Sequence, residues 1–349
     1  MAFRLLQVGL GNRGHQWAEV IAAQRGQVVL AGVVDTDSAR IEAFTARWGP
    51  VPAFGDVGRA LAAVEADAVL LVTPPDSHFA QAEHVFAAGL PLLAEKPLAA
   101  DLAKAAAIVR LAERHGQPLT VGLNFRYLPV TQAIRDLIAK GRFGYPGFAQ
   151  FTYQRNRDGR QPRLNKYPLT MRHPMMLEQS IHHLDLIRYA YGREVEAVAC
   201  RTWNPPWSMY AHDANVACLL TLEGGLEVSY LGTWAGGWNE LRFEWRTDCA
   251  AGVIIQRELF GDLATARTGD AYLTPVPLAE ARPSYDDTRA LLDAFITSLH
   301  NGERAPPCTG RDHLRSLALC FAAVEASETG KRIALDAFYA RQGLRELLS

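Results

Sequence analysis

Hydrophobic and polar residues alternate in two different patterns along the chain, and the change between them falls near residue 123. In the first part, short apolar runs alternate with longer stretches in which apolar residues recur every three or four positions. This order is typical of βαβ units around a parallel sheet. The strands expected there span residues 3–8, 28–34, 68–72, 91–94 and 119–121. The helices expected between them span residues 13–24, 38–48, 79–88 and 102–114.

The rest of the chain has a different pattern, in which β-branched and aromatic residues alternate with polar ones and turns contain glycine. We expect strands at residues 148–155, 195–202, 216–222, 226–234, 241–246 and 253–256, and helices at 288–300 and 312–329. Glu223-Gly224-Gly225 predicts a hairpin between two of these strands. The pattern therefore predicts an α/β domain with a doubly wound parallel sheet at residues 1–122 and an α+β domain at residues 123–349.

Composition narrows the class of ligand and the compartment. A chain of 349 residues with 49% hydrophobic content can bury the cores of two domains. Its net charge of −1 comes without a dense block of Lys or Arg, so neither a nucleic acid nor a membrane surface is the expected partner. No apolar run reaches the roughly 18 residues of a membrane-spanning helix, and no leader precedes the first strand pattern. The five cysteines contain no C-x-x-C pair, which argues against a disulfide framework or a zinc site and favours the cytoplasm.

A glycine fingerprint follows the first strand and opens the first helix. In the run Gly9-Leu-Gly11-Asn12-Arg13-Gly14, Gly9 permits a tight turn, Gly11 lets a pyrophosphate approach the backbone, and Gly14 allows close packing of helix on strand. The amide groups and the positive end of the helix dipole then face the phosphates. The pattern predicts a Rossmann dinucleotide site. The alternative is that a glycine-rich turn merely links strand and helix.

Asp35 ends the second strand, 21 residues after Gly14. A carboxylate at this position can accept both ribose hydroxyls and would repel a 2′-phosphate, which favours NAD over NADP as the cofactor. Arg40 weakens this preference, because an arginine near the ribose can accommodate the additional phosphate.

The third strand ends in Thr73-Pro74-Pro75-Asp76-Ser77-His78, at the edge of the sheet where open α/β folds bind ligands. Rigid prolines there would form a wall beside the cofactor. The same run also fits the start of a helix capped by Asp76 or Ser77, and the two interpretations are compatible.

The fourth strand ends in Glu95-Lys96-Pro97 at the same edge. Pro97 removes a ladder donor and favours a special turn, such as a cis peptide, that would direct Lys96 into the cleft. The competing interpretation is a solvated lysine at a strand end.

A second cluster of ionisable residues lies on one helical pattern. At 100° per residue, Glu178, His182 and Asp185 share a face, whereas His183 points away. An imidazole can take the proton of a hydroxyl as hydride leaves the carbon, and the carboxylates can orient it. The alternatives are an ion-pair network that includes Arg188 and a metal site built from the three residues. We expect no metal, because alcohol oxidation with NAD can proceed by proton and hydride transfer alone.

With these motifs in view, the whole chain resembles the Gfo/Idh/MocA family, which includes glucose–fructose oxidoreductase and inositol dehydrogenase. The resemblance also rests on the run from Gly122 to Tyr127, Gly-Leu-Asn-Phe-Arg-Tyr. It implies that Lys96 holds the reacting oxygen and that His182 is the general base. Glu178 stands where the family usually has Asp, so its implied contact with substrate hydroxyls is less secure.

The resemblance implies further properties of fold and assembly. The second domain is expected to hold a large, open, mainly antiparallel sheet flanked by helices, whose outer face joins the chains of a homodimer or homotetramer. Four tryptophans are candidates to cover that face, and they fit a core or a sugar-stacking role equally well. They are Trp203, Trp207, Trp234 and Trp238.

The resemblance also implies a function: an NAD-dependent oxidoreductase that transfers hydride between the nicotinamide and a hydroxyl-bearing carbon of a sugar, glycoside or cyclitol. The alternatives are a lyase or glycosidase that retains NAD for transient oxidation, and a nucleotide-binding regulator without chemistry. The residues expected at the cofactor are Gly9, Gly11, Asn12, Arg13, Gly14, Asp35, Thr73, Pro74, Pro75, His78, Glu95, Lys96 and Asn124. The residues expected at the small polyhydroxylated substrate are Lys96, Arg126, Tyr127, Arg155, Glu178 and His182, with Arg163, Asn165, His173 and His212 as further liners.

Overall fold

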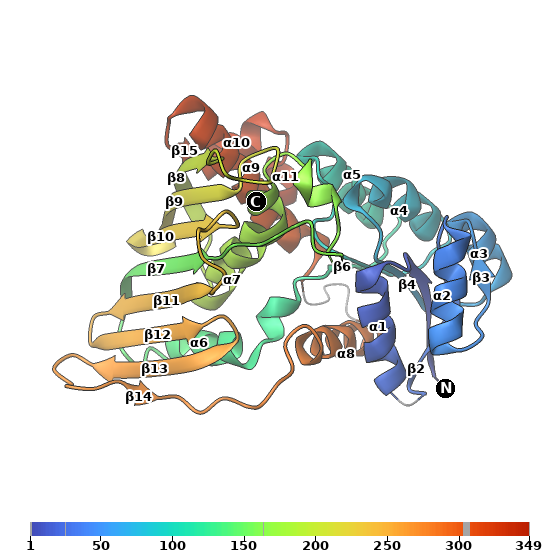
Figure 1. Cartoon of the computed structure of the whole chain (residues 1–349), viewed down its shortest axis with the longest axis horizontal. Coiled ribbons are helices and arrows are strands. Elements are labelled where there is room, and N and C mark those ends of the chain that lie inside the picture. The colour runs from blue at the N-terminus through green and yellow to red at the C-terminus, as the bar shows by residue number, and fades with distance from the viewer. Residues whose placement is uncertain (1, 25, 163, 303–307, 349) are drawn as a thin grey trace. The chain divides into compact units, whose positions relative to one another are not determined.

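The computed structural model describes residues 2–24, 26–162, 164–302 and 308–348. The chain divides into two compact units (Figure 1). The first contains Met1–Asn124 and Ser284–Leu314, and the second contains Phe125–Pro283 and Arg315–Ser349. No helix within the described ranges is both long enough and apolar enough to cross a membrane.

The first unit contains a parallel sheet of six strands in the order β3-β2-β1-β4-β5-β6. This order is that of dinucleotide-binding Rossmann folds, as the βαβ pattern predicted. The strands are β1 (Phe3–Val8), β2 (Val28–Val34), β3 (Ala53–Phe54), β4 (Ala68–Leu71), β5 (Leu92–Ala94) and β6 (Leu119–Val121). The helices between them are α1 (Asn12–Ala23), α2 (Ser38–Trp48), α3 (Val57–Ala63), α4 (His78–Ala87) and α5 (Leu102–Arg114).

The sequence pattern missed β3 and α3. Two residues of strand and seven of helix are too short to show a period of their own. Two of the longer helices, α2 and α5, begin at side-chain caps. Asp37 accepts a hydrogen bond from the amide of Ala39, and Asp101 accepts one from the amide of Lys104.

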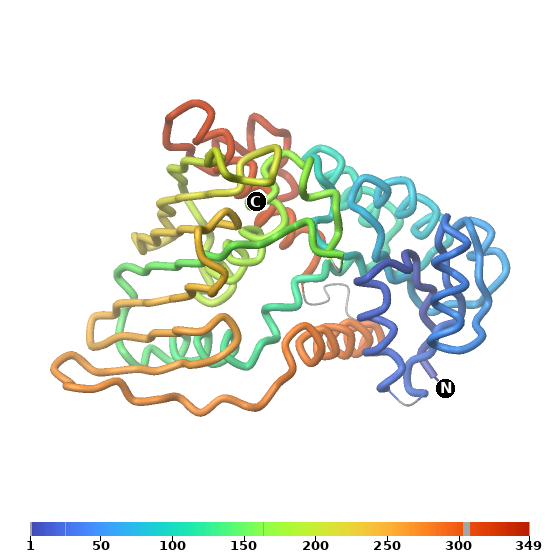
Figure 2. The backbone as a smooth tube through the Cα atoms, in the orientation of Figure 1, coloured from blue at the N-terminus to red at the C-terminus, as the bar shows by residue number. Residues whose placement is uncertain are grey.

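The segment Ser284–Leu314 returns to the first unit, whereas the sequence predicted one continuous second domain from residue 123 onward. Helix α8 (Asp286–His300) lies against α1, orange beside blue in Figure 2. Gln24 donates to Asp293 at 2.7 Å, and the rings of Phe3 and His300 meet edge to face at 5.8 Å. An amphipathic pattern states that a helix buries one face but not which core covers it, so the prediction was wrong at this segment.

The second unit contains a nine-stranded sheet in the order β14-β13-β12-β11-β7-β10-β9-β8-β15. Every neighbouring pair is antiparallel except β7 and β10, which are parallel. The mainly antiparallel sheet expected here is therefore confirmed, and β9 and β10 form the predicted hairpin at Glu223–Gly225. The strands are β7 (Pro146–Gln154), β8 (Val195–Trp203), β9 (Asn215–Leu222), β10 (Leu226–Thr233), β11 (Arg242–Cys249), β12 (Gly252–Glu258), β13 (Gly261–Arg267), β14 (Thr274–Pro275) and β15 (Ile333–Ala334).

Helices pack against one face of this sheet. Helix α6 contacts β13 and α7, and α10 contacts β8. The opposite face exposes large apolar side chains, including Phe148, which is 60% exposed, and Leu219, which is 51% exposed. The helices are α6 (Pro129–Ala139), α7 (Ile181–Tyr191), α9 (Gly310–Thr329, which begins in the first unit), α10 (Leu335–Arg341) and α11 (Arg345–Leu348).

Candidate functional site

The glycine turn between β1 and α1 leaves an open cradle at one position only. A Cβ on Gly9 would lie 2.6 Å from the carbonyl oxygen of Val72, and its φ of +103° also favours glycine. A Cβ on Gly14 would lie 2.3 Å from the carbonyl oxygen of Gly9. A Cβ on Gly11 would meet no described atom within 4 Å. At Gly9 and Gly14 the backbone of the turn is therefore packed too closely to admit a side chain. Gly11 leaves room for a ligand at the amino end of α1.

Asp35 lies at the tip of β2 beside this turn and is 8% exposed. Its Oδ2 accepts a hydrogen bond from the amide of Leu10 at 2.9 Å, and its Oδ1 accepts one from the amide of Asp37 at 3.0 Å. Arg40 Nη1 lies 3.7 Å from Oδ2. The carboxylate is thus fixed next to the glycine turn, with an arginine alongside it.

These features fit a dinucleotide. The Gly11 position is a space that a side chain would fill, the amino end of α1 supplies amide donors, and Asp35 supplies a fixed carboxylate for ribose hydroxyls. Asn12, the first residue of α1, lies on the exposed side of the same turn.

Glu95 joins α1 to the end of β5. Its Oε1 accepts hydrogen bonds from Arg13 Nε at 2.6 Å and from Trp17 Nε1 at 2.8 Å. Burial by itself would raise the pKa of Glu95, but the charge of Arg13, the donors on Trp17 and Arg13 and the charge of Lys96 together lower it. Both Arg13 and Glu95 were expected at the cofactor. In the structure their side chains bind each other, so they fix the strand end that carries Lys96.

Lys96 follows Glu95 directly and is partly buried. Its amide donates to Glu95 Oε2 at 3.3 Å, and the Lys96–Pro97 peptide bond is cis, as the sequence suggested. The backbone of this lysine is therefore held by the same carboxylate that binds α1.

The run Thr73–His78 lies between β4 and α4. Ser77 precedes the first residue of α4, but it makes no capping hydrogen bond with its side chain, so the helix start is confirmed and the expected cap is not. Pro75–Ser77 form a short 3-10 turn before α4, and Ser77 Oγ donates to the carbonyl of Pro74 at 2.9 Å. The buried ring of His78 lies between two carbonyl oxygens, those of Thr73 at 2.9 Å and Leu98 at 3.0 Å. Burial lowers the pKa of His78. The ring of His78 thus links the segments that follow β4 and β5, and its expected place at the cofactor stays a prediction.

Asn124 closes this edge of the first unit. Its amide nitrogen donates to Asp287 in the first turn of α8, and both side chains are buried. Burial raises the pKa of the Asp287 carboxyl. The sequence gave no signal for Asp287, because nothing in the helical pattern of residues 286–300 shows that this helix returns to the first unit.

In the second unit, His182 lies on the first turn of α7 and is 7% exposed. The ring of Phe125 stacks on its imidazole, with 4.4 Å between the centroids and 23° between the planes. Phe125 belongs to a run that the sequence singled out, but its role was missed. Its place between Asn124 and Arg126, two residues chosen as candidates, was the available signal.

Asp185 lies one turn beyond His182 and is the centre of a buried ion network. Arg126 holds it with two hydrogen bonds, at 2.7 and 2.5 Å, and Ser316 Oγ donates to it at 2.7 Å. Arg188 Nη1 lies 3.6 Å from the same carboxylate, and Arg188 Nη2 binds Glu194 at 2.7 Å. His182 and Asp185 thus share a face, as predicted, and the ion-pair network holds for Asp185. Arg126, expected at the substrate, is bound to Asp185.

His183 points the other way, into the sheet, as the helical spacing predicted. A directional chain of hydrogen bonds surrounds it: Tyr153 donates to Gln179 at 3.4 Å, and Tyr230 donates to Ser180 at 2.8 Å. The amide of Gln179 therefore donates to Nε2 at 3.0 Å, and Nδ1 donates to Tyr230 at 2.9 Å. Burial lowers the pKa of His183 to about 3, so the ring is neutral and accepts at Nε2.

Glu178 lies on a π-helical turn, Met175–Ser180, that precedes α7. Such turns are rare and often occur at functional sites. The sequence pattern treated the whole run as α-helix, which was wrong, because a π turn advances less than 100° per residue and shifts the phase of Glu178 relative to His182. The hydrogen bonds from Tyr153 to Gln179 and from Gln179 to His183 connect this turn to strand β7 and helix α7.

The other expected liners lie at several points of the second unit. Tyr127 and Arg155 are partly buried, and His173 Nδ1 lies 3.7 Å from Asp213. Asn165 and His212 are exposed, and Arg163 lies outside the described residues. Of the four tryptophans, Trp234 is buried, and Trp203, Trp207 and Trp238 are exposed.

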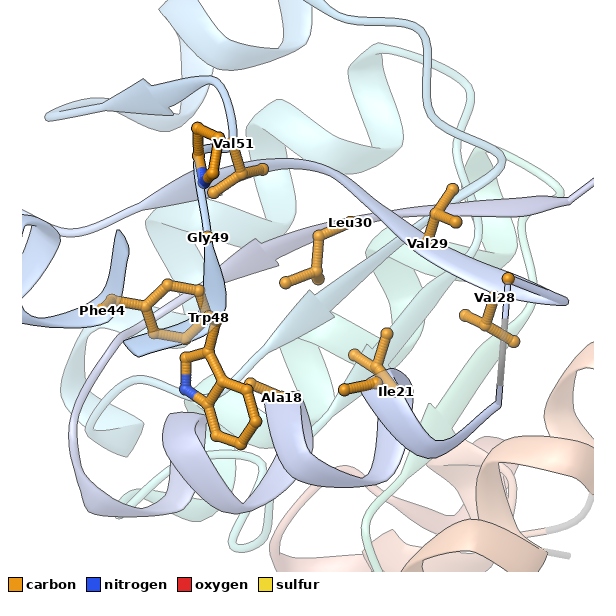
Figure 3. Close-up of a pocket in the computed structure, with 12 residues that line it drawn as sticks. Ala18, Ile21, Val28, Val29, Leu30, Phe44, Trp48, Gly49 and Val51 are labelled. Carbon is orange, nitrogen blue, oxygen red and sulfur yellow. The ribbon is translucent and has the colours of Figure 1, made fainter. Parts of the chain in front are cut away.

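An apolar pocket of about 290 Å³ lies elsewhere in the first unit, between α1, the start of β2 and the end of α2 (Figure 3). Ile21, Leu30 and Trp48 are among its lining side chains. It lies at the amino end of β2, whereas Asp35 and the glycine turn are at the carboxyl end. It offers no acid, base or nucleophile, so it is not a candidate for catalysis.

Within the described ranges, no three His, Cys, Asp or Glu side chains are grouped so that they could hold a metal ion. The carboxylate of Asp185, one of the three ligands considered from the sequence, is bound by two arginines instead.

Comparison with known families finds two matching models. One is described as an oxidoreductase family with an NAD-binding Rossmann fold and matches residues 3–123. The other is the GFO/IDH/MocA C-terminal domain and matches residues 131–252. Together they cover most of both units.

Individual relatives match the chain over nearly its whole length. D-apiose dehydrogenase of Paraburkholderia graminis is 28% identical, over 94% of this chain and 88% of the relative. Inositol 2-dehydrogenase of Rhizobium meliloti is 26% identical, over 96% of this chain and 100% of the relative. Among solved structures, an Agrobacterium radiobacter oxidoreductase in complex with NAD+, L-tartaric acid and magnesium superposes with a TM-score of 0.87 at 22% identity, over 97% and 99% of the two chains.

Proposed function

Because the chain belongs to the Gfo/Idh/MocA family of oxidoreductases, we propose that it is an NAD-dependent dehydrogenase that oxidises a hydroxyl-bearing carbon of a sugar, glycoside or cyclitol. The observation that carries this proposal is the glycine turn, which is packed at Gly9 and Gly14, open at Gly11, and has the carboxylate of Asp35 fixed beside it. The relatives named as D-apiose dehydrogenase and inositol 2-dehydrogenase support the substrate class.

We assign binding of the cofactor to the first unit. The amino end of α1 and the open position at Gly11 bind the pyrophosphate, and Asp35 binds the ribose hydroxyls of NAD. When bound, the nicotinamide supplies the acceptor for hydride. Asp35 favours NAD over NADP because its charge repels a 2′-phosphate.

We assign the proton chemistry to Lys96 and His182. The ammonium of Lys96 binds the reacting hydroxyl oxygen and stabilises the negative charge that develops there. The imidazole of His182 takes the hydroxyl proton as hydride leaves the carbon. This proposal requires both groups to reach the same hydroxyl.

The second unit supplies support for the base. Phe125 restricts the ring of His182 by stacking on it, and the neutral His183 fixes the turn before it. Glu178 is the remaining ionisable residue of this turn, and we assign to it the binding of further substrate hydroxyls. Asp185, held by Arg126, fixes α7 rather than acting on the substrate.

The test is NADH formation with a panel of sugars, inositols and glycosides. General acid–base groups contribute about 10²–10⁴-fold to rate, so Lys96→Ala and His182→Ala should lose activity on that scale while binding NAD as the wild type does. Lys104→Ala and His115→Ala, both exposed and on α5 or at its end, are matched controls that should keep full rate. Full activity in either Lys96→Ala or His182→Ala would contradict the assignment.

The alternative chemistry, with NAD retained for elimination or glycoside cleavage, uses the same two residues. Stoichiometric NADH per substrate consumed supports the dehydrogenase. Product without net NADH supports the alternative, and nucleotide binding without turnover of any substrate supports a regulator.

We also propose a cytoplasmic homodimer or homotetramer. The five cysteines are thiols rather than disulfides, which fits a reducing compartment. The outer face of the nine-stranded sheet, with Phe148 and Leu219 exposed, is the surface proposed to join the chains. Light scattering of the protein in solution tests the assembly.

A further inference from the structure

Two arginines continue the line of β7 beyond its last paired residue. The amide of Arg155 donates to the carbonyl of Thr233 at 3.2 Å, and the amide of Arg157 donates to that of Trp234 at 2.9 Å. Asn156, between them, forms a β-bridge with Ala235. The backbone of this segment is therefore extended and fixed against the end of β10.

Side chains alternate along such a segment, so Arg155 and Arg157 share a face with Tyr153 and Phe151. Phe151 and Tyr153 each place a ring 4.8 Å from the ring of His183. The two arginines therefore lie on the side of the sheet that carries α7 and the turn with Glu178. Because side chains alternate between the two faces of a strand, both guanidinium groups lie on the face of the sheet that is covered by the helix carrying His182.

The two fully buried arginines among the described residues of this unit each have a carboxylate partner. Arg126 binds Asp185, and Arg188 binds Glu194. Arg155 and Arg157 differ, because within residues 2–24, 26–162, 164–302 and 308–348 neither forms an ion pair with an acidic side chain. Arg155 Nε and Arg157 Nη1 are buried, and no hydrogen-bond acceptor among the described residues meets them.

Asp158 and Asp213 have other partners. Asp158 Oδ1 accepts from the amide of Arg160 at 2.9 Å. Asp213 accepts from Thr202 at 2.6 Å and lies 3.7 Å from His173. A buried N–H donor without an acceptor is unfavourable, so these two nitrogens, one on each partly buried arginine, point to an acceptor supplied from outside the chain.

The position of Arg157 is fixed by an aromatic contact. Its guanidinium lies 4.1 Å from the centre of the Trp234 ring, and Tyr210 Oη donates to the Arg157 carbonyl at 2.8 Å. A guanidinium stacked on an aromatic ring keeps its N–H donors in the plane available for a partner. The planar fork of arginine matches the oxygens of a carboxylate or phosphate with two parallel hydrogen bonds.

We propose that the substrate carries an anionic group, a carboxylate or a phosphate, which Arg155 and Arg157 bind while the hydroxyl-bearing carbon lies at His182. This inference rests on the proposed dehydrogenase function and specifies its substrate class. It assigns Arg155, considered from the sequence only as a general liner, to recognition of charge, and it adds Arg157, which the sequence did not single out.

The test compares neutral substrates with counterparts that carry one anionic group. Glucose, glucuronate and glucose 6-phosphate form one set, and myo-inositol and its monophosphate form another. The proposal predicts that one anionic member of a set has a kcat/KM at least about tenfold above the neutral member, because hydrogen bonds from arginine to a charged group are stronger than those to a neutral one. Comparing kcat/KM for the carboxylate member with kcat/KM for the phosphate member shows which of the two anionic groups the site binds.

The variants Arg155→Ala and Arg157→Ala should remove that preference, mainly through KM for the anionic member. Arg155→Lys should restore part of it, since the charge remains but the fork is lost. Arg160→Ala, an exposed arginine of the same loop, is the matched control and should leave the preference unchanged. Equal kcat/KM for neutral and anionic members, or a preference that survives both alanine variants, would overturn the inference.

A binding measurement separates this inference from the proposed function. Calorimetry with tartrate and with inorganic phosphate should show binding to the wild type and to Arg160→Ala, and its loss in Arg155→Ala. If no substrate yields NADH but this pattern holds, the dehydrogenase proposal fails and the anion site stands. If NADH forms only from neutral substrates and neither anion binds, the anion site fails and the dehydrogenase stands.

Discussion

Single residues decide the choice of cofactor. Asp35 is held by the amides of Leu10 and Asp37, so its carboxylate cannot move away from the glycine turn. Arg40 Nη1, at 3.7 Å, is close enough to bind a phosphate if the carboxylate is removed. The two side chains therefore oppose each other in the choice between NAD and NADP.

Replacing Asp35 tests this balance. Asp35→Ser should raise the ratio of kcat/KM for NADP to that for NAD by about tenfold or more, because it removes the repulsion of the 2′-phosphate and a charged hydrogen-bond acceptor. The double variant Asp35→Ser with Arg40→Ala should lose most of the gain for NADP. An unchanged ratio in the single variant would show that Asp35 does not contact the ribose.

At this scale the sequence predicts residue types well and side-chain partners poorly. Glycine spacing and Asp35 can be identified from local geometry, because turn, strand end and helix start are neighbours in the chain. The sequence cannot show that Arg13 binds Glu95, 82 residues away, or that Arg126 binds Asp185, 59 residues away. Arg13, Glu95, His78 and Arg126 each have a protein partner that the sequence did not show, and their expected contacts with ligands stay predictions.

At the scale of elements, the junction of β1 and α1 combines a structural and a binding role at neighbouring glycines. A Cβ on Gly14 would collide with backbone, at 2.3 Å from Gly9 O and 3.1 Å from Gly9 C. Gly11 precedes the helix with φ −72°, which other residues adopt readily, and a Cβ there would meet no described atom within 4 Å.

Two alanine variants separate these roles. Gly14→Ala should lower the free energy of unfolding by about 1–3 kcal/mol, since backbone must move to admit the methyl group. Gly11→Ala should leave thermal unfolding of the nucleotide-free protein unchanged and weaken NAD binding by about tenfold or more, because the methyl group occupies the space of a pyrophosphate. Equal NAD affinity in Gly11→Ala and the wild type would mean that the dinucleotide does not approach this turn.

Periodicity explains only some of the elements that the sequence missed, because α6, of 11 residues, and β13, of seven, were missed as well. Strand alternation and helical spacing need several residues to become visible, so β3, β14 and β15, each of two residues, gave no signal. The π turn at Met175–Ser180 was read as α-helix because its apolar residues fit either form. This turn contains Glu178, so the wrong helix type was assigned to a residue of the candidate site.

At the scale of the whole molecule, the proposed reaction divides its tasks between the two units. The first holds the glycine turn, Asp35 and Lys96, and the second holds His182 with Phe125 stacked on it. The second also carries Arg155 and Arg157, which we propose bind an anionic group of the substrate. The proposed reaction therefore uses groups from both units.

The most direct test is a crystal structure of the protein with NAD and a bound substrate. The proposal predicts that Lys96 Nζ and a ring nitrogen of His182 both lie within about 3.2 Å of the same hydroxyl oxygen, and that the carbon bearing it lies about 3.5 Å from the nicotinamide C4. A complex in which those two groups face different surfaces, or in which no pyrophosphate lies at Gly11, would contradict the proposed function.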